Sequence, residues 1–326
     1  MTKAIQLSRN GGPEVMEYGD IDVGKPAAGE ALIRQSAIGL NFIDVYFRTG
    51  LYKAPNGFPF VPGNEGAGEV LEVGEGVTDL KPGDRVAYAG GPLGAYSAER
   101  VIPADRLVKV PDGVALDTAA AMMLKGMTVE YLLHRTYPVK AGDILLFHAA
   151  AGGVGLIAGQ WAKALGATVI GTAGSAQKVE LAKSHGYDHV INYREEDFVE
   201  RVKEITDGKG VDVVYDSVGK DTFPGSLDCL RPRGMWALFG QSSGAVAPVD
   251  LGILAQKGSL FATRPTLFTY IASRADLELS AGRLFEAVQS GKVRIEINQT
   301  YPLAEAARAH ADLEARKTTG TTLLKP

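Results

Sequence analysis

Three glycines follow an apolar strand pattern and open a helix pattern in the run Phe147-His148-Ala149-Ala150-Ala151-Gly152-Gly153-Val154-Gly155. Such a turn can bind a pyrophosphate, because glycine permits the tight bend and lets the backbone approach the phosphates at the helix N-terminus. Apolar residues at helical spacing continue from Val154 to Leu165. Ala150 replaces the first glycine of the dinucleotide fingerprint, so the alternative is a glycine-rich turn without a ligand.

The next strand lacks the acidic residue that selects NADH. In NAD-binding domains an Asp or Glu about twenty positions past the glycine loop bonds the ribose 2′-hydroxyl and repels a 2′-phosphate. No Asp or Glu stands between Ala167 and Lys178, where Ser175 and Lys178 end the segment instead. A hydroxyl and an ammonium group there favour NADPH. The alternative for Lys178 is an ordinary exposed lysine on the following helix.

The elements that must position this turn begin after about residue 118, where apolar runs of strand length alternate with segments of helix length. This alternation predicts βαβ units, a parallel sheet and an α/β fold. The predicted strands are Ile144–His148, Thr168–Thr172, His189–Asn192, Val211–Tyr215, Met235–Phe239 and Ser259–Thr263.

The first third of the chain instead contains short β-like runs separated by Gly and Pro, such as Glu30–Ile38, Ala67–Val73 and Arg85–Ala89. We expect a mostly antiparallel β domain there. The predicted boundaries are 1–124 for this domain, 125–265 for the nucleotide-binding domain, and 266–326 for a return to the first domain. The last segment should include a helix through Leu277–Val288.

The composition excludes several function classes. A net charge of −4 and scattered Lys and Arg predict no nucleic-acid partner and no membrane surface. The stretch Ile144–Ala162 has no charged Asp, Glu, Lys or Arg, but its glycines, His148 and Gln160 identify it as a buried strand-turn-helix. The single cysteine, Cys229, permits no intrachain disulfide or thiolate cluster, which favours a cytoplasmic location.

Motifs spread along the whole chain resemble one family. They are Asn41–Asp44, Gly63–Gly68, Lys81–Val86, Gly142–Lys163 and Asp216–Gly219. Together they resemble the quinone oxidoreductases, the ζ-crystallin group of the medium-chain dehydrogenase/reductase superfamily. The resemblance implies a GroES-like catalytic domain, a doubly wound Rossmann domain, an active-site cleft between them, and a homodimer formed through the edge of the Rossmann sheet.

The resemblance also implies which residues bind NADPH, with Tyr193 and Arg316 completing the 2′-phosphate site. The expected set is Asn41, Thr128, Tyr131, Gly152, Gly153, Val154, Gly155, Gly174, Ser175, Lys178, Tyr193, Ser217, Phe239, Gly240 and Arg316.

The departures from the zinc-dependent relatives predict a metal-independent enzyme. Those relatives place a zinc-binding Cys where this chain has Asn41, and a zinc-binding His where it has Asn64. Asn is a poor zinc ligand compared with thiolate or imidazole. His185 and His189 have an i, i+4 spacing, but Gly186 interrupts the helix that would make it meaningful, so we expect a surface turn entering a strand. The remaining histidines, His134, His148 and His310, are expected to be structural.

Without zinc to polarise a carbonyl oxygen, the acceptor should already be electrophilic, as quinones and conjugated enones are. The resemblance favours quinones. The residues expected to serve catalysis are Asn41, Asp44, Tyr46, Tyr52, Lys125, Thr128 and Arg264. Among them, Arg264 could stabilise an oxyanion and the tyrosines could donate hydrogen bonds. For Tyr46 and Tyr52 the alternative is ordinary packing, and for Asp44 it is helix capping.

Two further function classes stay open: an NADPH-dependent enone reductase, and a non-catalytic NADPH-binding stress or RNA-binding protein. The acidic pI of about 5.8 counts against RNA.

Overall fold

The computed structural model describes residues 1–326, which form two compact units. The first unit comprises Met1–Met127, Ile271–Gln289 and Ile295–Pro326, and the second comprises Thr128–Tyr270 and Ser290–Arg294. The sequence-based boundaries lay at 124/125 and 265/266. The observed division at 127/128 falls inside α2 (Leu116–Tyr131), which begins in the first unit and ends in the second. Because the boundary falls within a continuous helix, the helical sequence pattern is the same on both sides and does not indicate where the units divide.

The first unit is built on a seven-stranded sheet that is antiparallel except where β14 pairs with β15. The strands follow the order β14-β15-β3-β4-β5-β7, and β6 pairs with β3. They are β3 (Glu30–Leu40), β4 (Glu65–Val73), β5 (Arg85–Ala89), β6 (Glu99–Pro103), β7 (Val108–Lys109), β14 (Ile297–Pro302) and β15 (Thr321–Lys325). A separate hairpin pairs β1 (Thr2–Leu7) with β2 (Met16–Ile21).

The helices of the first unit include α1 (Phe42–Thr49), α9 (Arg274–Gln289) and α10 (Ala306–Glu314). The segment expected to return to this unit pairs directly with it, since β15 lies antiparallel to β3 with Leu324 opposite Ile38. Ile33, Ile38, Val86, Tyr88 and Leu324 belong to its buried core. Short 3-10 turns occur at Pro13–Val15, Ala104–Arg106 and Leu303–Glu305.

The second unit holds a six-stranded sheet whose neighbours are all parallel, in the order β10-β9-β8-β11-β12-β13. The strands are β8 (Ile144–Phe147), β9 (Thr168–Ala173), β10 (His189–Asn192), β11 (Val211–Asp216), β12 (Leu230–Leu238) and β13 (Phe261–Thr263). Numbered along the chain, this is the 3-2-1-4-5-6 order of the Rossmann fold. The α/β prediction and the prediction of a doubly wound Rossmann sheet are therefore confirmed.

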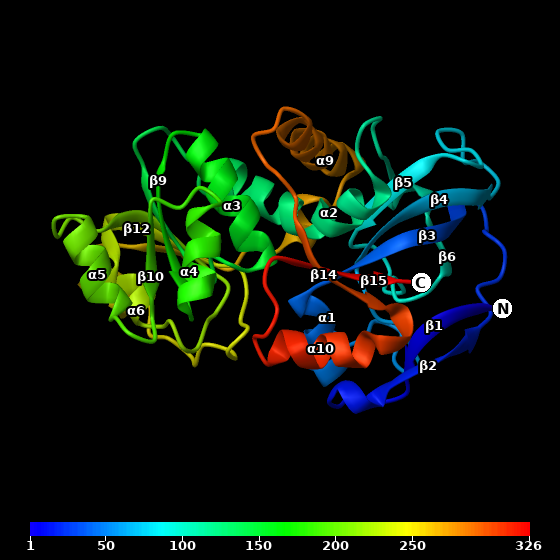
Figure 1. Ribbon diagram of the computed structural model, residues 1–326, viewed down its shortest axis with the longest axis horizontal. Helices are drawn as coiled ribbons and strands as arrows, with labels where there is room; N and C mark the ends of the chain where they lie inside the picture. The colour runs from blue at the N-terminus through cyan, green and yellow to red at the C-terminus, as the bar shows by residue number, and fades with distance from the viewer. The chain divides into compact units, whose positions relative to one another are not determined.

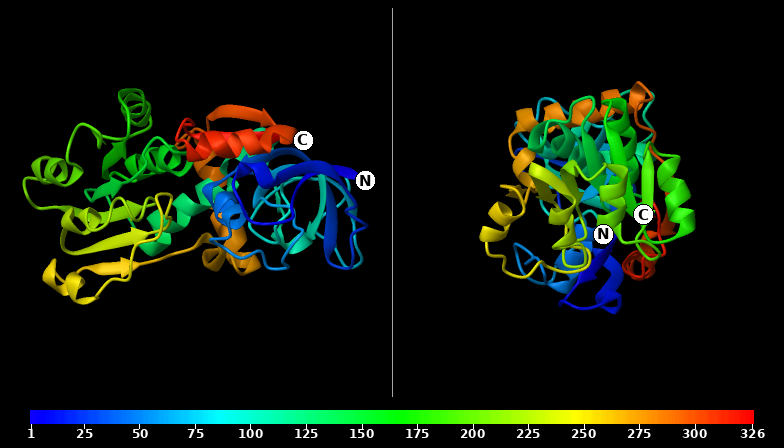
Figure 2. Two further views of the ribbon diagram at one scale, coloured as in Figure 1. Left: turned by 90° about the horizontal axis from the view of Figure 1, so that it is seen from below. Right: turned by 90° about the vertical axis from the view of Figure 1, so that its left-hand side faces the viewer.

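Helices cover both faces of this parallel sheet. α3 (Gly153–Ala164) and α4 (Ala176–Lys183) lie on one side of the strands, and α5 (Phe198–Ile205) and α6 (Gly225–Asp228) lie on the other (Figure 1). The short helices α7 (Gly252–Gln256) and α8 (Leu267–Tyr270) flank β13, which forms the outer edge of the sheet (Figure 2, gold strand in the left view). Leu146, Ile170, Val214 and Trp236 belong to the core of this unit.

One irregular element follows α2, where Leu132–Thr136 form a π-helical turn. None of the helices has the length and apolar character required to cross a bilayer.

Candidate functional site

The turn between β8 and α3 has room only for glycine at position 155, where α3 comes closest to the backbone of the turn. A Cβ atom at Gly155 would lie 2.5 Å from the carbonyl oxygens of Ala149 and Ala150. Gly152 is the N-cap of α3 and offers no side-chain hydrogen bond. The first N–H groups of α3 therefore lack an intrahelical acceptor, and the helix dipole adds positive potential to them. This arrangement fits the pyrophosphate of a dinucleotide.

The imperfect fingerprint has a local explanation. Ala150, which stands in place of the first glycine, is fully buried, and its side chain faces β9 at Gly171. A Cβ atom on Gly171 would come within 2.6 Å of Ala150 Cβ. Glycine on the neighbouring strand thus makes the room that alanine in the turn requires.

Polar groups gather where β9 ends. Ser175 is the N-cap of α4, and its Oγ accepts a hydrogen bond of 3.3 Å from Lys178 N–H. The Tyr193 hydroxyl lies over Gly174, where a Cβ atom would be 2.4 Å from its oxygen. Ser175 therefore caps α4, a role that was not predicted from the sequence. From the sequence, its hydroxyl was considered only as a hydrogen-bond donor to the 2′-phosphate. Its O–H proton remains compatible with donation to a ligand.

The ends of β11 and β12 bring together three more residues of the expected cofactor set. Phe239 and Gly240 donate backbone hydrogen bonds of 2.8 and 3.2 Å to the Asp216 carbonyl oxygen. A Cβ atom at Gly240 would lie 2.8 Å from the carbonyl oxygen of Ser217. Ser217, Phe239 and Gly240 thus form one close-packed corner at the carboxyl edge of the parallel sheet, where ligands of Rossmann domains bind.

Tyr131 is buried in an aromatic stack. Its ring lies parallel to that of Tyr270, with centroids 4.4 Å apart, and Arg135 lies over the Tyr270 ring at 5.0 Å. Burial raises the pKa of Tyr131, while the positive charge of Arg264 acts in the opposite direction. Thr128, one turn earlier on α2, is also buried. One face of the Tyr131 ring therefore packs against Tyr270.

Asn41, Asp44, Lys125 and Arg316 belong to the first unit, whereas the glycine turn and the end of β9 belong to the second. Arg316 follows α10 with a left-handed φ of 58°.

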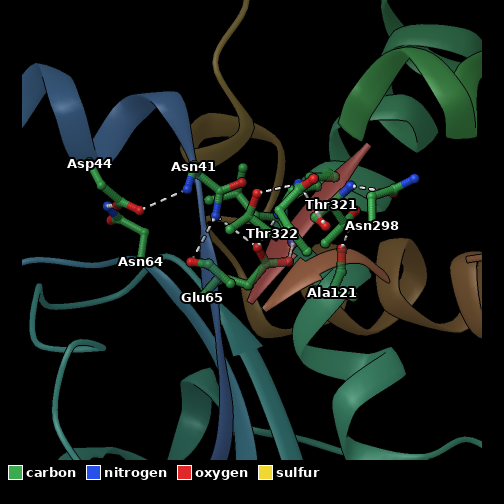
Figure 3. Close-up of polar contacts among 12 residues, drawn as sticks. Asn41, Asp44, Asn64, Glu65, Ala121, Asn298, Thr321 and Thr322 are labelled. Atoms are coloured by element: carbon green, nitrogen blue, oxygen red, sulfur yellow. Dashed lines mark hydrogen bonds and ion pairs between the residues drawn. The ribbon is translucent and has the colours of Figure 1, made fainter. Parts of the chain in front are cut away.

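A buried polar cluster lies where β3, α1, β4 and α2 meet in the first unit (Figure 3). Glu65 is its centre. One carboxylate oxygen, Oε2, accepts hydrogen bonds from Asn41 Nδ2 at 2.7 Å and from Lys125 Nζ at 2.8 Å. The other, Oε1, accepts a hydrogen bond of 2.7 Å from Leu124 N–H. Lys125 is only 5 % exposed, so this is a buried ion pair with a satisfied carboxylate.

Asp44 is the second buried carboxylate. It accepts hydrogen bonds from the Asn41 backbone N–H at 3.0 Å, from Asn64 Nδ2 at 2.9 Å and from the Tyr96 hydroxyl at 3.1 Å. Burial raises the pKa of Asp44 to about 6, although these hydrogen bonds favour the carboxylate. The contact with the Asn41 N–H is the helix-capping role that the sequence left open for Asp44.

Tyr46 and Tyr52 form an aromatic cluster next to these groups. Their ring centroids are 5.3 Å apart in an edge-to-face arrangement, and Phe42 and Phe47 each contact one of them. Tyr46 is 9 % exposed. Both tyrosines therefore pack against other aromatic rings, which is the alternative given for them from the sequence.

Sequence reasoning missed Glu65 and Tyr96 as site residues. Glu65 could have been found, because a glutamate in the small, apolar run Glu65-Gly66-Ala67-Gly68 must be buried and therefore must have a partner. Tyr96 carried no such signal. Its partner His310 is 214 residues away in the sequence, with a distance of 2.9 Å between Tyr96 Oη and His310 Nε2.

Three histidines, His148, His185 and His310, are buried, and one of them differs from the sequence-based expectation. His185 is buried, and its Nδ1 donates to the Leu181 carbonyl oxygen at 2.8 Å, so it does not belong to a surface turn as expected. The ring satisfies a carbonyl at the end of α4 that the helix leaves free. His148 and His310 are also buried.

Comparison with known proteins places these features in a family. Residues 27–112 match the alcohol dehydrogenase GroES-like domain, and residues 153–277 match the zinc-binding dehydrogenase family. A quinone oxidoreductase of Pseudomonas aeruginosa is 56% identical over 326 residues, covering 100% of both chains. A 2-haloacrylate reductase of a Burkholderia species is 48% identical and covers 100% of this chain and 99% of its own.

The crystal structure of Escherichia coli quinone oxidoreductase complexed with NADPH superimposes with a TM-score of 0.97 at 52% identity, covering 99% of this chain and 100% of that one. Similarity of this degree along the entire chain shows that the protein belongs to the quinone oxidoreductase family of the medium-chain dehydrogenase/reductase superfamily.

Proposed function

We propose that this protein is an NADPH:quinone oxidoreductase that works without a metal. The absence of a metal from the proposed mechanism is supported by the hydrogen bonds of Asn41 and Asn64. Their Nδ2 groups donate to the carboxylates of Glu65 and Asp44, respectively. In zinc-dependent relatives these two positions hold metal ligands. Amide N–H groups aimed at carboxylates stabilise a hydrogen-bonded cluster and cannot coordinate a cation.

NADPH supplies a hydride from its nicotinamide ring, and one further proton completes reduction of the quinone to the hydroquinone. Gly152, Gly153, Val154 and Gly155 bind the pyrophosphate through the N-terminus of α3. Ser175, Lys178 and Tyr193 hold the 2′-phosphate, and Arg316 contributes a second cation. The group at the end of β9 supports this assignment, since it combines two hydroxyls and an ammonium without an acidic residue.

Further cofactor contacts come from Asn41, Thr128, Tyr131, Gly174, Ser217, Phe239 and Gly240. The close packing of Gly240 on Ser217 supports the last of these, because a larger residue would close that corner.

On the acceptor side, Lys125 stabilises the negative charge that develops on a quinone oxygen. An almost fully buried ammonium acts in a low dielectric, where its effect is larger than in water. Glu65 holds this ammonium with a single hydrogen bond, which leaves donors for an acceptor oxygen. Asn41 and Arg264 add hydrogen-bond donors, Tyr46 and Tyr52 form an aromatic wall, and Asp44 positions Asn41 and Asn64.

A second candidate activity is reduction of a conjugated carbon–carbon double bond, the enone reductase alternative. The similarity to a 2-haloacrylate reductase supports it, because a haloacrylate is a conjugated, electrophilic alkene. The same chemistry is required in both cases: hydride enters an electrophilic acceptor while charge develops on an oxygen.

NADPH oxidation on chelator-treated protein tests the proposal. We expect turnover with para- and ortho-quinones to exceed turnover with alkenones and 2-chloroacrylate, and elemental analysis to find no stoichiometric zinc. Faster reduction of the alkenes would replace quinones with the second candidate. Tight NADPH binding without turnover of any acceptor would favour the non-catalytic alternative, and stoichiometric zinc would overturn the metal-independent mechanism.

The proposal includes a homodimer and a cytoplasmic location. Strand β13 lies at the edge of the parallel sheet and carries Phe261, which is 59% exposed. Leu251, directly before α7, is 74% exposed. An edge strand with exposed apolar side chains is suited to pairing with a second copy. The only cysteine, Cys229, is a buried free thiol, which suits a reducing compartment.

A further inference from the structure

A buried chain of polar side chains runs beneath the carboxyl edge of the parallel sheet. His148, which follows β8, is 1% exposed. Its Nδ1 lies 3.0 Å from Thr172 Oγ1 on β9, and its Nε2 lies 3.1 Å from Ser226 Oγ on α6. Ser226 Oγ in turn lies 2.8 Å from Oδ2 of Asp216, the last residue of β11. No step proposed for the reaction uses these four side chains.

Asp216 is the acceptor at the end of this chain. Its Oδ2 also accepts hydrogen bonds from the Thr222 hydroxyl at 2.8 Å and from Trp236 Nε1 at 3.2 Å. Its Oδ1 accepts from the backbone N–H groups of Val218 and Gly219 at 2.8 and 3.0 Å. Burial opposes ionisation of Asp216, but the hydrogen bonds from these donors favour the carboxylate, and the pKa of Asp216 is lowered. A carboxylate surrounded by five donors can only accept.

The direction of every hydrogen bond follows from that carboxylate. The single hydroxyl proton of Ser226 points to Asp216, so Ser226 Oγ must accept from His148 Nε2–H. Burial lowers the pKa of His148 and keeps the ring neutral. Its Nδ1 is therefore an acceptor and receives the hydroxyl proton of Thr172. The chain runs one way, from Thr172 through His148 and Ser226 to Asp216.

Three members stand one or two positions before a loop that the proposed function assigns to the cofactor. His148 precedes the turn 149–155, which begins with Ala149 in a left-handed conformation at φ 57°. Thr172 precedes Gly174 and Ser175 by two and three positions. Asp216 precedes Ser217 and holds the N–H groups of the following two residues. A strained backbone such as that at Ala149 persists only where its surroundings determine it.

We propose that Thr172, His148, Ser226 and Asp216 act as positioning residues for NADPH: they hold the three cofactor loops in their binding geometry without touching the cofactor. The inference rests on the proposed NADPH site. Such pre-organisation lowers the cost of ordering the loops when the ligand binds, so its loss should weaken cofactor affinity and leave the acceptor chemistry intact.

Thr172→Val and Ser226→Ala test this inference, because each removes one hydroxyl from the chain. We expect the Kd for NADPH, measured by titration of nicotinamide fluorescence, to rise about tenfold in each variant. The kcat at saturating NADPH and the KM for the quinone should stay close to wild type. Thr172→Ser, which keeps the hydroxyl, should retain wild-type affinity.

Thr206→Val is the matched control. Thr206 is another buried threonine of the same unit, and its hydroxyl donates to the Val202 carbonyl oxygen and accepts from the Gly210 N–H. It lies between α5 and the start of β11, whereas the cofactor loops follow the carboxyl ends of the strands. The variant should lose stability without losing NADPH affinity. Because the chain passes through His148, the double variant of Thr172 and Ser226 should show a smaller loss than the sum of the single losses.

NADPH binding by the wild-type protein and by the variants distinguishes failure of the proposed function from failure of this inference. Wild-type protein that does not bind NADPH would overturn the proposed function and this inference with it. Wild-type binding with unchanged affinity in both Thr172→Val and Ser226→Ala, or an equal loss in Thr206→Val, would overturn the inference alone. If Ser226→Ala does not fold, the comparison of Thr172→Val with Thr172→Ser decides.

Discussion

At the scale of single residues, the choice of cofactor depends on very few side chains. The end of β9 carries Ser175 and Lys178 and no carboxylate, and the Tyr193 hydroxyl lies over Gly174. A 2′-phosphate carries about two negative charges, so an ammonium at this place matters more for NADPH than for NADH. The same position leaves the NADH ribose hydroxyls without a carboxylate partner.

Lys178→Ala should therefore raise the KM for NADPH by about 10- to 150-fold, which corresponds to about 1.5–3 kcal/mol for a lost charge-assisted hydrogen bond. The KM for NADH should hardly change. Steady-state kinetics with both cofactors measures the difference. Lys183→Ala is the control on the same helix, since Lys183 is paired with Glu180 at the far end of α4. Equal losses with NADPH and NADH would show that Lys178 does not contact the 2′-phosphate.

At the scale of elements, a second buried chain joins α1 to α10. Arg48 Nη1 lies 3.2 Å from His310 Nδ1, and His310 Nε2 lies 2.9 Å from the Tyr96 hydroxyl, which donates to Asp44. Arginine can only donate, so His310 Nδ1 is an acceptor and the ring is neutral. Burial, with a contribution from Arg48, lowers the pKa of His310 to about 3. The packing of α10 thus depends on an uncharged histidine.

This arrangement predicts acid sensitivity with a definite sign. In the unfolded chain His310 binds a proton with a pKa of about 6.5, whereas in the folded protein its pKa is about 3. Protonation therefore favours the unfolded chain, and the free energy of unfolding decreases as the pH falls from about 6.5 towards 3. Between pH 7.5 and 5 the loss should be about 2 kcal/mol. Asp44, whose pKa is raised to about 6, has the opposite effect over about pH 6 to 4.

His310→Asn removes the histidine contribution and leaves Asp44 in place. Urea unfolding at pH 7.5 and pH 5 should show that the stability advantage of wild type over the variant shrinks by about 2 kcal/mol at the lower pH. His189→Asn, which replaces an exposed histidine at the start of β10, is the control. An advantage that is the same at both pH values would mean that His310 is not held neutral.

At the scale of the whole molecule, the two units share one chain that crosses between them at 127/128, 270/271, 289/290 and 294/295. The parallel sheet has one edge at β10 and the other at β13. Strand β13 is only three residues long and is paired on one side alone, with β12. A two-fold axis at this edge would join the sheets of two copies through β13, which is the self-complementary contact typical of dimers.

Phe261→Lys should therefore convert a dimer into a monomer, because a charge on an edge strand opposes pairing. Light scattering coupled to size-exclusion chromatography measures the mass of each species. Leu279→Lys is the matched control, since Leu279 is a 44% exposed apolar residue on α9 of the first unit. A monomeric wild type, or dissociation by both variants alike, would argue against pairing through β13.

Much of the fold could be predicted from the sequence because its signals are local. The strand-turn-helix from Ile144 to Ala164 follows from apolar periodicity and from glycines that no other residue can replace, such as Gly155. The absence of an acidic residue between Ala167 and Lys178, and of Cys and His at positions 41 and 64, is readable directly. These features depend only on residue type and spacing, so the sequence by itself determined the fold class and the NADPH pattern.

The partners of the buried polar groups were decided only by the tertiary structure. Glu65 meets Lys125 across 60 positions, His148 meets Ser226 across 78, and Arg48 meets His310 across 262. Periodicity indicates that such a residue is buried, but not which distant residue satisfies it, because the pairing depends on how strands and helices are brought together. For that reason the contacts of Asp44 with Asn64 and Tyr96, and the place of Glu65 and Tyr96 in the site, emerged only in the folded chain.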